Sequence, residues 1–264
     1  MTEEISLDKI ASSGAISMSP ELFEKLYLTP KAHHTGDNIK RYANPTAMAL
    51  AGFVISDLTL ATNLMGWGGA SGLTPVVGIF FFVGPVLLTL ALIFEWIMGN
   101  FFSMMVCALF DAFWLSNGLV HLPTLGLAAP YSASGTDNVQ GAASPEYNAA
   151  LALFYIIWGF ALVTYAVFTL RTNVVFVLIF VFSFVGTFTL SGAFWKVSTG
   201  DFVLAHNLQV AGAALFFVVG CLGWYMILVI MSAEMAITTK LPVGDLSHLW
   251  ANSDEEMARG RKND

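Results

Sequence analysis

The stretch RYANPTAMALAGF, residues 41–53, passes from charged to largely apolar residues within three positions. Asn44 can cap a helix, and Pro45 suits the first helical position because its missing N–H would have no partner there. The apolar run continues past the stretch and includes an acid, Asp57, about twelve residues into the predicted helix. The stretch therefore predicts the start of a membrane-spanning helix that carries an ionisable group near its middle.

The whole chain has the composition of an integral membrane protein. Of its 264 residues, 56% are hydrophobic and 11% are charged, whereas a soluble domain carries about 25% charged residues. A hydrocarbon core is spanned by about 17–25 helical residues. We therefore expect an all-α integral membrane protein with six transmembrane helices, near 45–66, 75–98, 101–121, 148–170, 174–194 and 208–233. Gly52 and Ser56 give the first helix a small-residue surface for close helix contact.

The basic residues predict the orientation of these helices. If the N-terminus is cytoplasmic, Lys196 is the only Lys or Arg outside the cell, as the positive-inside rule favours. We therefore place both termini in the cytoplasm. The chain divides into a cytoplasmic tail (1–43), a six-helix pore domain (44–234) and a second cytoplasmic tail (235–264). The loop at 122–147 is expected to be external and irregular, and SPELFEKLYL (19–28) resembles the start of a short capped helix.

The residues that the chain lacks exclude several classes of function. Between Ala43 and Val174 the only basic residue is Arg171, so nucleic acid is not an expected partner. Cys107 and Cys221 both lie in apolar runs, which predicts packed thiols rather than a disulfide or a metal site. Neither an HExxH motif nor a serine–histidine arrangement is present. We therefore predict no enzymatic activity, no catalytic residue, no metal and no cofactor.

The start of the first helix is a candidate site for an anion. A helix N-terminus gathers free N–H groups and a partial positive charge, and Asn44 adds a side-chain amide. A carboxylate could dock there without a basic side chain. This matters because the predicted spans contain neither Lys nor Arg.

Polar and aromatic residues share one face of the third and of the fifth predicted helix. On the third they recur at steps of four and three: Ser103, Cys107, Phe110, Trp114, Asn117 and His121. On the fifth they are Phe184, Thr187 and Ser191. Polar groups facing lipid would be costly. These faces therefore predict either a wet, constricted path or a seam of hydrogen bonds between helices.

The sequence resembles the acetate uptake transporter family, the succinate–acetate permeases of bacteria and their fungal relatives. Asn44-Pro45, Leu50, Gly52 and Phe53 match its N-P-x-P-L-G-L-x-G-F signature. Further matches follow in order: EWIMGNFF at 95–102, FW at 113–114, FSF at 182–184, and Glu234 followed by LPVG at 241–244. Three positions depart from the signature, namely Ala47, Met48 and Ala49. The extended tails resemble the fungal branch.

The resemblance implies a channel or proton-coupled transporter for small carboxylate anions such as acetate or succinate. It implies a homo-oligomer, a hexamer, in the plasma membrane, with the lipid bilayer around it and one pathway inside each subunit. It implies that the pathway is lined by signature residues, of which we take Asn44, Pro45, Thr46 and Leu50 as substrate-binding. It also implies an apolar constriction formed by Phe53, Phe110 and Phe184.

The acids within the spans need separate explanations. Glu95 and Arg171 are expected on the same side of the membrane, which predicts an ion pair. Asp57 has no basic partner, and a charge at that depth costs about 2.5–3.5 kcal/mol on insertion scales. Because burial disfavours the charged form of an acid, Asp57 is a candidate for a protonated group that couples proton movement to transport. The alternative is a structural role, with Asp57 satisfied by hydroxyls such as those of Thr59 or Thr62.

Other functions remain open from the sequence. A membrane nutrient sensor is one, because the tails leave room for a signalling partner, although six helices argue against a heptahelical receptor. An ammonia or ammonium exporter of the same fold is another. An aquaporin needs two facing Asn-Pro motifs, and this chain has one.

Overall fold

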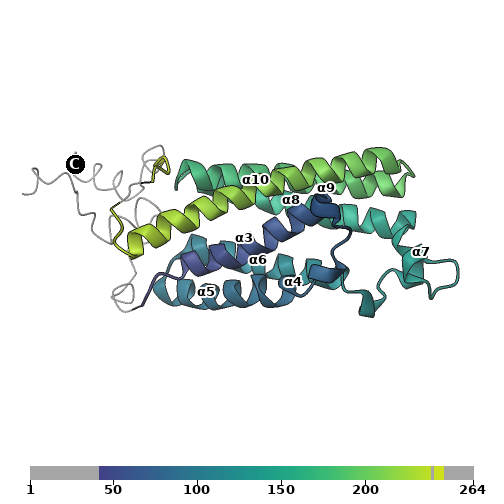
Figure 1. The fold of residues 1–264 in the computed structure, drawn as a ribbon, viewed down its shortest axis with the longest axis horizontal. Coiled ribbons are helices and arrows are strands. Elements are labelled where there is room, and N and C mark those ends of the chain that lie inside the picture. Colours follow the sequence, from purple (N-terminus) through teal and green to yellow (C-terminus); the bar gives the residue numbers. More distant parts are fainter. Residues whose placement is uncertain (1–41, 239–240, 247–264) are drawn as a thin grey trace, which may run out of the picture.

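The computed structural model describes residues 42–238 and 241–246, and these residues form an elongated helical bundle (Figure 1). The helices are α3 (Thr46–Leu64), α4 (Ile79–Phe82), α5 (Gly84–Met98), α6 (Phe101–Val120), α7 (Asn138–Ala142), α8 (Pro145–Thr169), α9 (Val174–Ser198) and α10 (Phe202–Glu234). Six segments are long and apolar enough to cross a membrane, which confirms the predicted fold class. The SPELFEKLYL stretch and most of both predicted tails lie outside the described residues.

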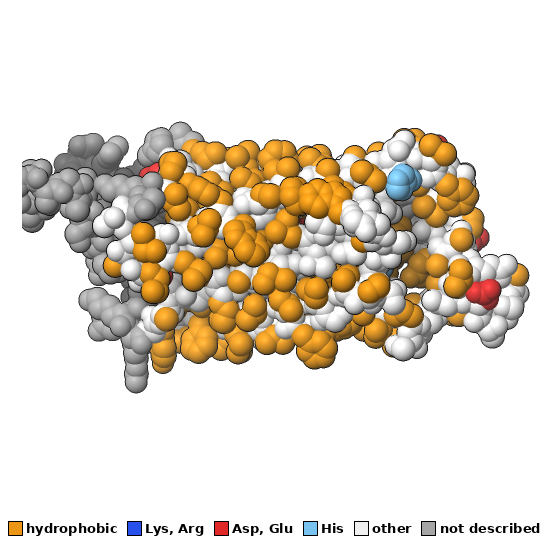
Figure 2. Space-filling view, in the orientation of Figure 1, with side chains coloured by type: hydrophobic (Ala, Val, Ile, Leu, Met, Phe, Trp, Pro, Cys, Tyr) orange, Lys and Arg blue, Asp and Glu red, His pale blue; other side chains and the backbone are white. Residues whose placement is uncertain are grey.

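Both ends of the described chain lie at the same end of the bundle (Figure 1). We call this the proximal end and the opposite one the distal end. An even number of crossings gives this arrangement, and the assignment of the proximal end to the cytoplasm stays a prediction. Hydrophobic side chains predominate on the face of the bundle shown in Figure 2, between the two ends, as expected of a surface in contact with lipid.

The helices pack in a sequence that leaves an interior between them. α8 packs on α9, α9 on α10, α10 on α3, α3 on α5, and α5 on α6. Aromatic side chains connect α6 with α8, because the Phe113 ring lies 5.3 Å from that of Trp158 and 6.5 Å from that of Phe154. Side chains of both the earlier helices (α3–α6) and the later helices (α8–α10) therefore line the interior of the bundle.

The second crossing is interrupted where it packs closely against the first and the third. α4 ends and α5 begins around Val83, because Pro85 lacks an N–H and its ring disfavours a continuous helix. A Cβ on Gly84 would lie 2.7 Å from Ser56 Oγ. One on Gly52 would lie 2.8 Å from Leu87 Cβ. The predicted small-residue surface of the first helix is therefore used for this contact.

The structure differs from the sequence prediction in three further ways. α9 and α10 extend beyond the predicted spans, so Lys196 lies in the last turn of α9. There its charge complements the helix dipole, and the spans are not wholly without basic residues. The loop at 122–147 is not simply irregular, because it holds two short 3-10 turns and α7. Cys107 is buried as expected, but Cys221 is exposed on α10.

The segment after α10 returns to the turn between α8 and α9. The Tyr225 hydroxyl donates to the Pro242 carbonyl at 2.6 Å. The Val174 N–H donates to the Gly244 carbonyl at 2.8 Å, and the Leu246 N–H donates to the Thr172 carbonyl at 3.1 Å. These bonds fix the LPVG segment (241–244) against the proximal end of α9.

Candidate functional site

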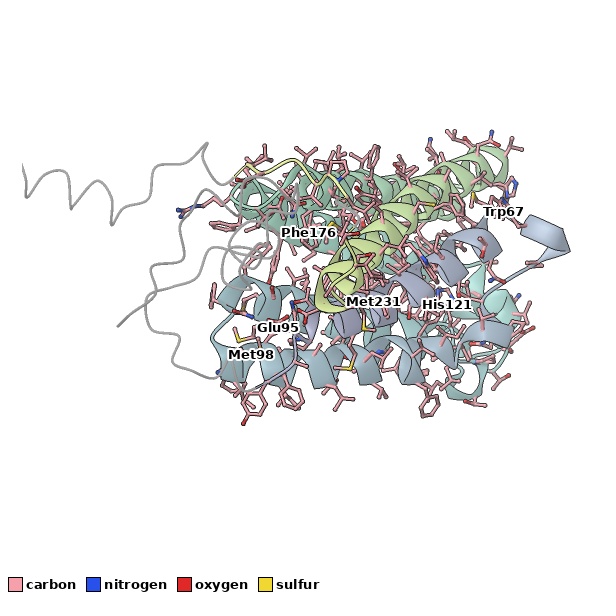
Figure 3. The ribbon with its side chains drawn as sticks, turned by 60° about the vertical axis from the view of Figure 1, so that its left-hand side comes forward. Trp67, Glu95, Met98, His121, Phe176 and Met231 are labelled. Atoms are coloured by element: carbon pink, nitrogen blue, oxygen red, sulfur yellow. The ribbon has the colours of Figure 1, made fainter. Side chains whose placement is uncertain are left out.

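Three cavities follow one another through the interior of the bundle. The proximal cavity, of about 60 Å³, is lined near its mouth by Thr46 and Leu50 of α3 and by Phe176 of α9. Ser103 and Cys107 of α6 line it as well. Figure 3 shows Phe176 and Glu95 toward the proximal end, with Trp67 and His121 toward the distal end.

An aromatic cluster separates the proximal cavity from the next one. The rings of Phe53 (α3) and Phe110 (α6) lie 4.4 Å apart, and the Phe180 ring (α9) lies 6.0 Å from that of Phe110. Phe53 and Phe110 are only 6% and 8% exposed, and both line the cavities on either side. These two rings therefore stand between the two spaces.

The middle cavity is small and holds the acid of the first helix. Its volume is about 20 Å³, and its lining includes Asp57, Ser183 and Thr187 together with Phe53 and Phe110 of the aromatic cluster. Asp57 is 2% exposed, and its Oδ2 has no hydrogen-bond partner among the described residues. A Cβ on Gly220 of α10 would lie 3.1 Å from this oxygen. Asp57 therefore lies between the cavity and a close helix contact.

The hydroxyls of Thr59 and Thr62, named above as alternative partners of Asp57, do not donate to it. The Thr59 hydroxyl donates to the Ile55 carbonyl and the Thr62 hydroxyl donates to the Leu58 carbonyl, each at 2.7 Å. Both hydroxyl protons are thus used within α3, as Thr side chains commonly do in helices.

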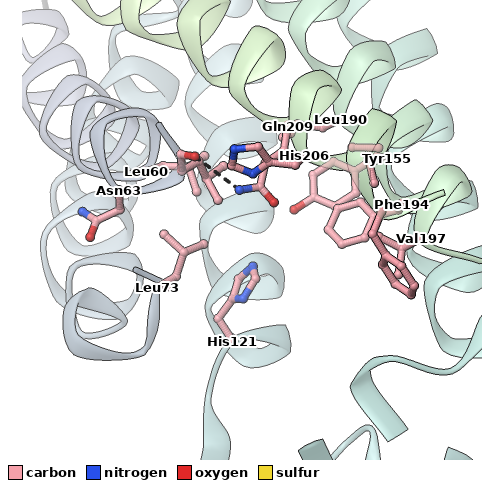
Figure 4. A pocket seen from close by; sticks show the side chains of 15 residues that line it. Leu60, Asn63, Leu73, His121, Tyr155, Leu190, Phe194, Val197, His206 and Gln209 are labelled. Carbon is pink, nitrogen blue, oxygen red and sulfur yellow. Dashed lines mark hydrogen bonds between the residues drawn. The ribbon is translucent and has the colours of Figure 1, made fainter. Parts of the chain in front are cut away.

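The distal cavity is the largest, at about 410 Å³ (Figure 4). Leu60 lines both this cavity and the middle one. His121, Tyr155 and His206 contribute polar groups. Gln209 also lines it and donates to the Leu64 carbonyl at 3.2 Å. Burial lowers the pKa of His121 from its ordinary value of 6.5 to about 4, so this imidazole is neutral at physiological pH.

The predicted face of α6 runs along all three cavities. Ser103 and Cys107 line the proximal cavity, Phe110 and Trp114 the middle one, and His121 the distal one. Asn117 is fully buried, and its Oδ1 accepts a hydrogen bond from the Tyr155 hydroxyl at 2.8 Å. The face therefore combines the path and the helix seam that the sequence left as alternatives.

The fifth crossing corrects one predicted residue. Phe184 lines none of the three cavities, and its ring lies 6.3 Å from that of Phe188. Phe184 is eight residues after Phe176, which rotates it by about 80° around the helix. Phe180 is four residues after Phe176 and is rotated by about 40°. Phe180 therefore occupies the place predicted for Phe184.

The other residues of the predicted α9 face divide between the two alternatives. Thr187 lines the middle cavity. The Ser191 hydroxyl instead donates to the Ala152 carbonyl of α8 at 2.7 Å. Ser191 therefore belongs to the seam between α8 and α9.

The signature residues at the start of α3 are held by a buried acid. α3 begins at Thr46, one residue later than the Asn44 cap and Pro45 start predicted. Asn44 Oδ1 accepts from the Thr46 N–H at 3.0 Å, and the Thr46 hydroxyl donates to Glu95 Oε1 at 2.5 Å. Asn100 Nδ2 donates to the second oxygen of Glu95 at 2.8 Å. Thr46 and Leu50 line the proximal cavity, whereas Asn44 and Pro45 do not.

The ion pair predicted between Glu95 and Arg171 stays a prediction. Glu95 is fully buried and is satisfied in part by the neutral donors Thr46 and Asn100. Arg171 lies in the turn between α8 and α9, next to Thr172, whose carbonyl accepts from the Leu246 N–H of the returning segment.

Several lining residues were not predicted from the sequence. Phe180 could have been found from the face of Ser183 and Thr187, which lie three and seven residues after it. His206 and Gln209 lie at the distal start of α10; His206 lies just before the span predicted at 208–233, and Gln209 lies at its start. The sequence does not single out Tyr155 or Leu60 as cavity-lining residues, because each is surrounded by other apolar or aromatic residues.

Comparisons with known proteins agree with this architecture. The model of the GPR1/FUN34/yaaH family matches residues 27–248. The chain is 38% identical to Protein alcS of Aspergillus fumigatus over 255 residues, which cover 94% of this chain and 91% of that protein. It is 27% identical to the acetate transporter protein patA of Aspergillus clavatus, over 84% of this chain and 85% of that protein.

A solved structure shares the fold. The bacterial acetate channel SatP superposes with a TM-score of 0.57 at 21% identity, covering 77% of this chain and 99% of that one. The two relatives compared by sequence, alcS and patA, are both fungal, as the resemblance implied. With the family match extending over most of the chain and over all six crossings, the protein belongs to the GPR1/FUN34/yaaH family.

Proposed function

We propose that the protein is a channel or proton-coupled transporter that carries small carboxylates, acetate first among them, across the plasma membrane. It works as a homo-hexamer in which each subunit has its own pathway. The observation that carries the proposal is the series of three cavities inside one subunit, which share lining residues at Phe53, Phe110 and Leu60. Relatives named as acetate transporters support acetate as the substrate.

A carboxylate meets neutral donors at the proximal mouth. Asn44 uses its Oδ1 to accept from the Thr46 N–H, which leaves its Nδ2–H₂ group to donate to a substrate oxygen. The free N–H groups of the first turn of α3 add to this attraction. Because the Thr46 hydroxyl donates to Glu95, Thr46 offers the cavity its oxygen lone pairs. A protonated acid is therefore accepted at Thr46 more readily than an anion.

The aromatic cluster of Phe53, Phe110 and Phe180 forms the constriction. Apolar rings exclude water from a narrow passage and thereby close it to ions. Phe53 and Phe110 have the contact that such a gate requires, since their rings lie 4.4 Å apart.

Asp57 is the proposed proton-coupling group. It lies directly beyond the constriction, is 2% exposed, and carries an oxygen with no hydrogen-bond partner among the described residues. An ionised acid there would repel a carboxylate strongly in a low dielectric, so Asp57 is neutral when substrate passes. It can then donate a hydrogen bond to the substrate or release the proton that accompanies it.

Flux through purified protein tests this function. We expect proteoliposomes to take up radiolabelled acetate faster than protein-free liposomes made from the same lipid. Uptake should saturate, should be competed by unlabelled small carboxylates and not by ammonium, and should respond to an imposed pH gradient. Folded protein that binds acetate but adds no flux would favour a nutrient sensor. Competition by ammonium alone would favour an ammonia exporter.

A further inference from the structure

The middle cavity has a different barrier toward each end of the bundle. Toward the proximal end it shares two lining residues, Phe53 and Phe110, with the proximal cavity. Toward the distal end it shares one, Leu60, with the distal cavity. Asp57 lines the middle cavity and neither of the other two. The acid therefore lies between an aromatic barrier and an aliphatic one.

The proximal barrier is apolar and closed. The rings of Phe53 and Phe110 lie 4.4 Å apart, and both residues are almost fully buried. A narrow passage between such side chains excludes water, because they offer it no hydrogen bond. A proton carried by water therefore cannot reach Asp57 from the proximal cavity while the two rings are in contact.

The distal barrier contains polar groups. Asn117 of α6 lies between Trp114, which lines the middle cavity, and His121, which lines the distal one. It is fully buried, and its Nδ2 has no hydrogen-bond partner among the described residues. Its Oδ1 accepts from the hydroxyl of Tyr155, which also lines the distal cavity. A buried donor without a protein partner favours a water molecule beside it.

The distal cavity brings water close to this barrier. Its volume is about 410 Å³, which leaves room for several water molecules. Gly72 and His206 line it and are exposed, so the cavity reaches the surface at the distal end. Leu60, His121 and Tyr155 surround its inner part (Figure 4). Water in this cavity is therefore separated from the middle cavity by Leu60, at a level where the wall is partly polar.

Asp57 is the single titratable group along the middle cavity. The lining of that cavity comes from α3, α6, α8, α9 and α10, and no other acid, base or tyrosine of the described residues contributes to it. The titratable residues that line the distal cavity are His121, Tyr155 and His206. A proton that passes Leu60 therefore has Asp57 as its acceptor.

We propose that Asp57 exchanges its proton with the aqueous compartment at the distal end, through water that passes Leu60 and Asn117, while the aromatic cluster stays closed. The step moves one proton between the carboxyl group and water. The inference rests on the proton-coupling role proposed above and adds the side from which the acid is loaded. With the proximal end in the cytoplasm, as predicted, that side is the cell exterior. Asp57 is then protonated before the rings part and substrate reaches it.

A thiol in place of the acid reports which side reaches it. Full-length protein with Cys107→Ala, Cys221→Ala and Asp57→Cys is placed in sealed vesicles of uniform orientation, without substrate, and Ag⁺ is added on one side. Ag⁺ is small enough to follow water, and it blocks thiols. The thiols that remain are counted with a maleimide after quenching and denaturation. We expect distal Ag⁺ to block position 57 at least tenfold faster than proximal Ag⁺. Ser103→Cys in the proximal cavity and His206→Cys in the distal one define the two sides.

Further variants test the same path from other positions. Thr187→Cys, which also lines the middle cavity, should show the same preference for distal Ag⁺ if Asp57→Cys fails to fold. Leu60→Ala, added to either thiol variant, should accelerate the distal reaction at least tenfold. Leu64→Ala is the matched control, because Leu64 lines only the distal cavity, and it should leave the rate unchanged. Equal rates from the two sides, a faster proximal reaction, no reaction from either side, or no effect of Leu60→Ala would each overturn the proposal.

Acetate flux through the parent protein separates two failures. A parent that carries acetate, with position 57 open to the proximal side, refutes only the side of loading. A parent that carries no acetate refutes the proposed function, and the coupling role of Asp57 with it.

Discussion

Replacing Phe53 by Ala should open the pathway more often. The Phe53 ring contacts that of Phe110 at 4.4 Å, and an aromatic pair contributes about 0.5–1.5 kcal/mol beyond its buried area. If the rings separate when substrate passes, losing the pair lowers the barrier by that amount. The rate of passage then rises about 2- to 13-fold. The fold bears a separate cost, because truncating a buried Phe removes about 3–5 kcal/mol of stability.

The assay is initial acetate uptake into proteoliposomes, divided by the amount of folded protein in each preparation. Phe184→Ala is the matched control, because Phe184 lines none of the three cavities and should leave uptake unchanged. Phe180→Ala should raise uptake as Phe53→Ala does. The reasoning is refuted if folded Phe53→Ala protein transports at the parental rate, or if Phe184→Ala alone accelerates uptake.

Three further predictions concern polar residues along the proposed path. Asn44→Ala should weaken acetate affinity about 2- to 10-fold, because one neutral hydrogen bond is lost. The measurement is the KM of acetate uptake. A lower Tm with an unchanged KM would indicate that Asn44 only caps the helix. Asp57→Asn should still exchange acetate but lose its response to an imposed pH gradient, and a parental response would rule out coupling there. Because burial lowers the pKa of His121 to about 4, the unfolded chain binds more protons between about pH 6.5 and 4. Tm should therefore decrease as the pH is lowered from about 6.5 to 4, and this decrease should be smaller in the His121→Gln variant. A variant with the parental pH dependence of Tm would contradict this.

Periodicity and hydropathy predicted the helices and most of the α6 face, because both depend on one helix at a time. The steps from Ser103 to His121 place these residues on one side of α6 wherever that helix lies. The same reasoning failed for Phe184. On α9, Phe176, Phe180 and Phe184 recur at steps of four, and the sequence gives no means of ranking them. Only the rotation of α9 against its neighbours decides which ring meets Phe110.

Interactions between crossings were also beyond the sequence. Glu95 was predicted to pair with Arg171 because opposite charges on one side of the membrane attract. Its described partners are the neutral donors Thr46 and Asn100, one of them 49 residues away along the chain. The sequence suggested the hydroxyls of Thr59 and Thr62 as partners for Asp57, but both hydroxyls donate to carbonyls of α3 instead. Donors on other helices, and donors already used within the same helix, cannot be identified from the sequence alone.

The cavity volumes determine what must move for transport to occur. The middle cavity, at about 20 Å³, has room for about one water molecule, whereas acetate has four non-hydrogen atoms. The distal cavity, at about 410 Å³, admits a hydrated carboxylate without rearrangement. A substrate that leaves the distal cavity must therefore displace Leu60 or the rings of Phe53 and Phe110, which line the middle cavity. The described conformation is thus a closed state, and its narrow part coincides with Asp57. Substrate reaches this acid only when the rings have separated, so opening the constriction and exposing the proposed proton-coupling group are one event.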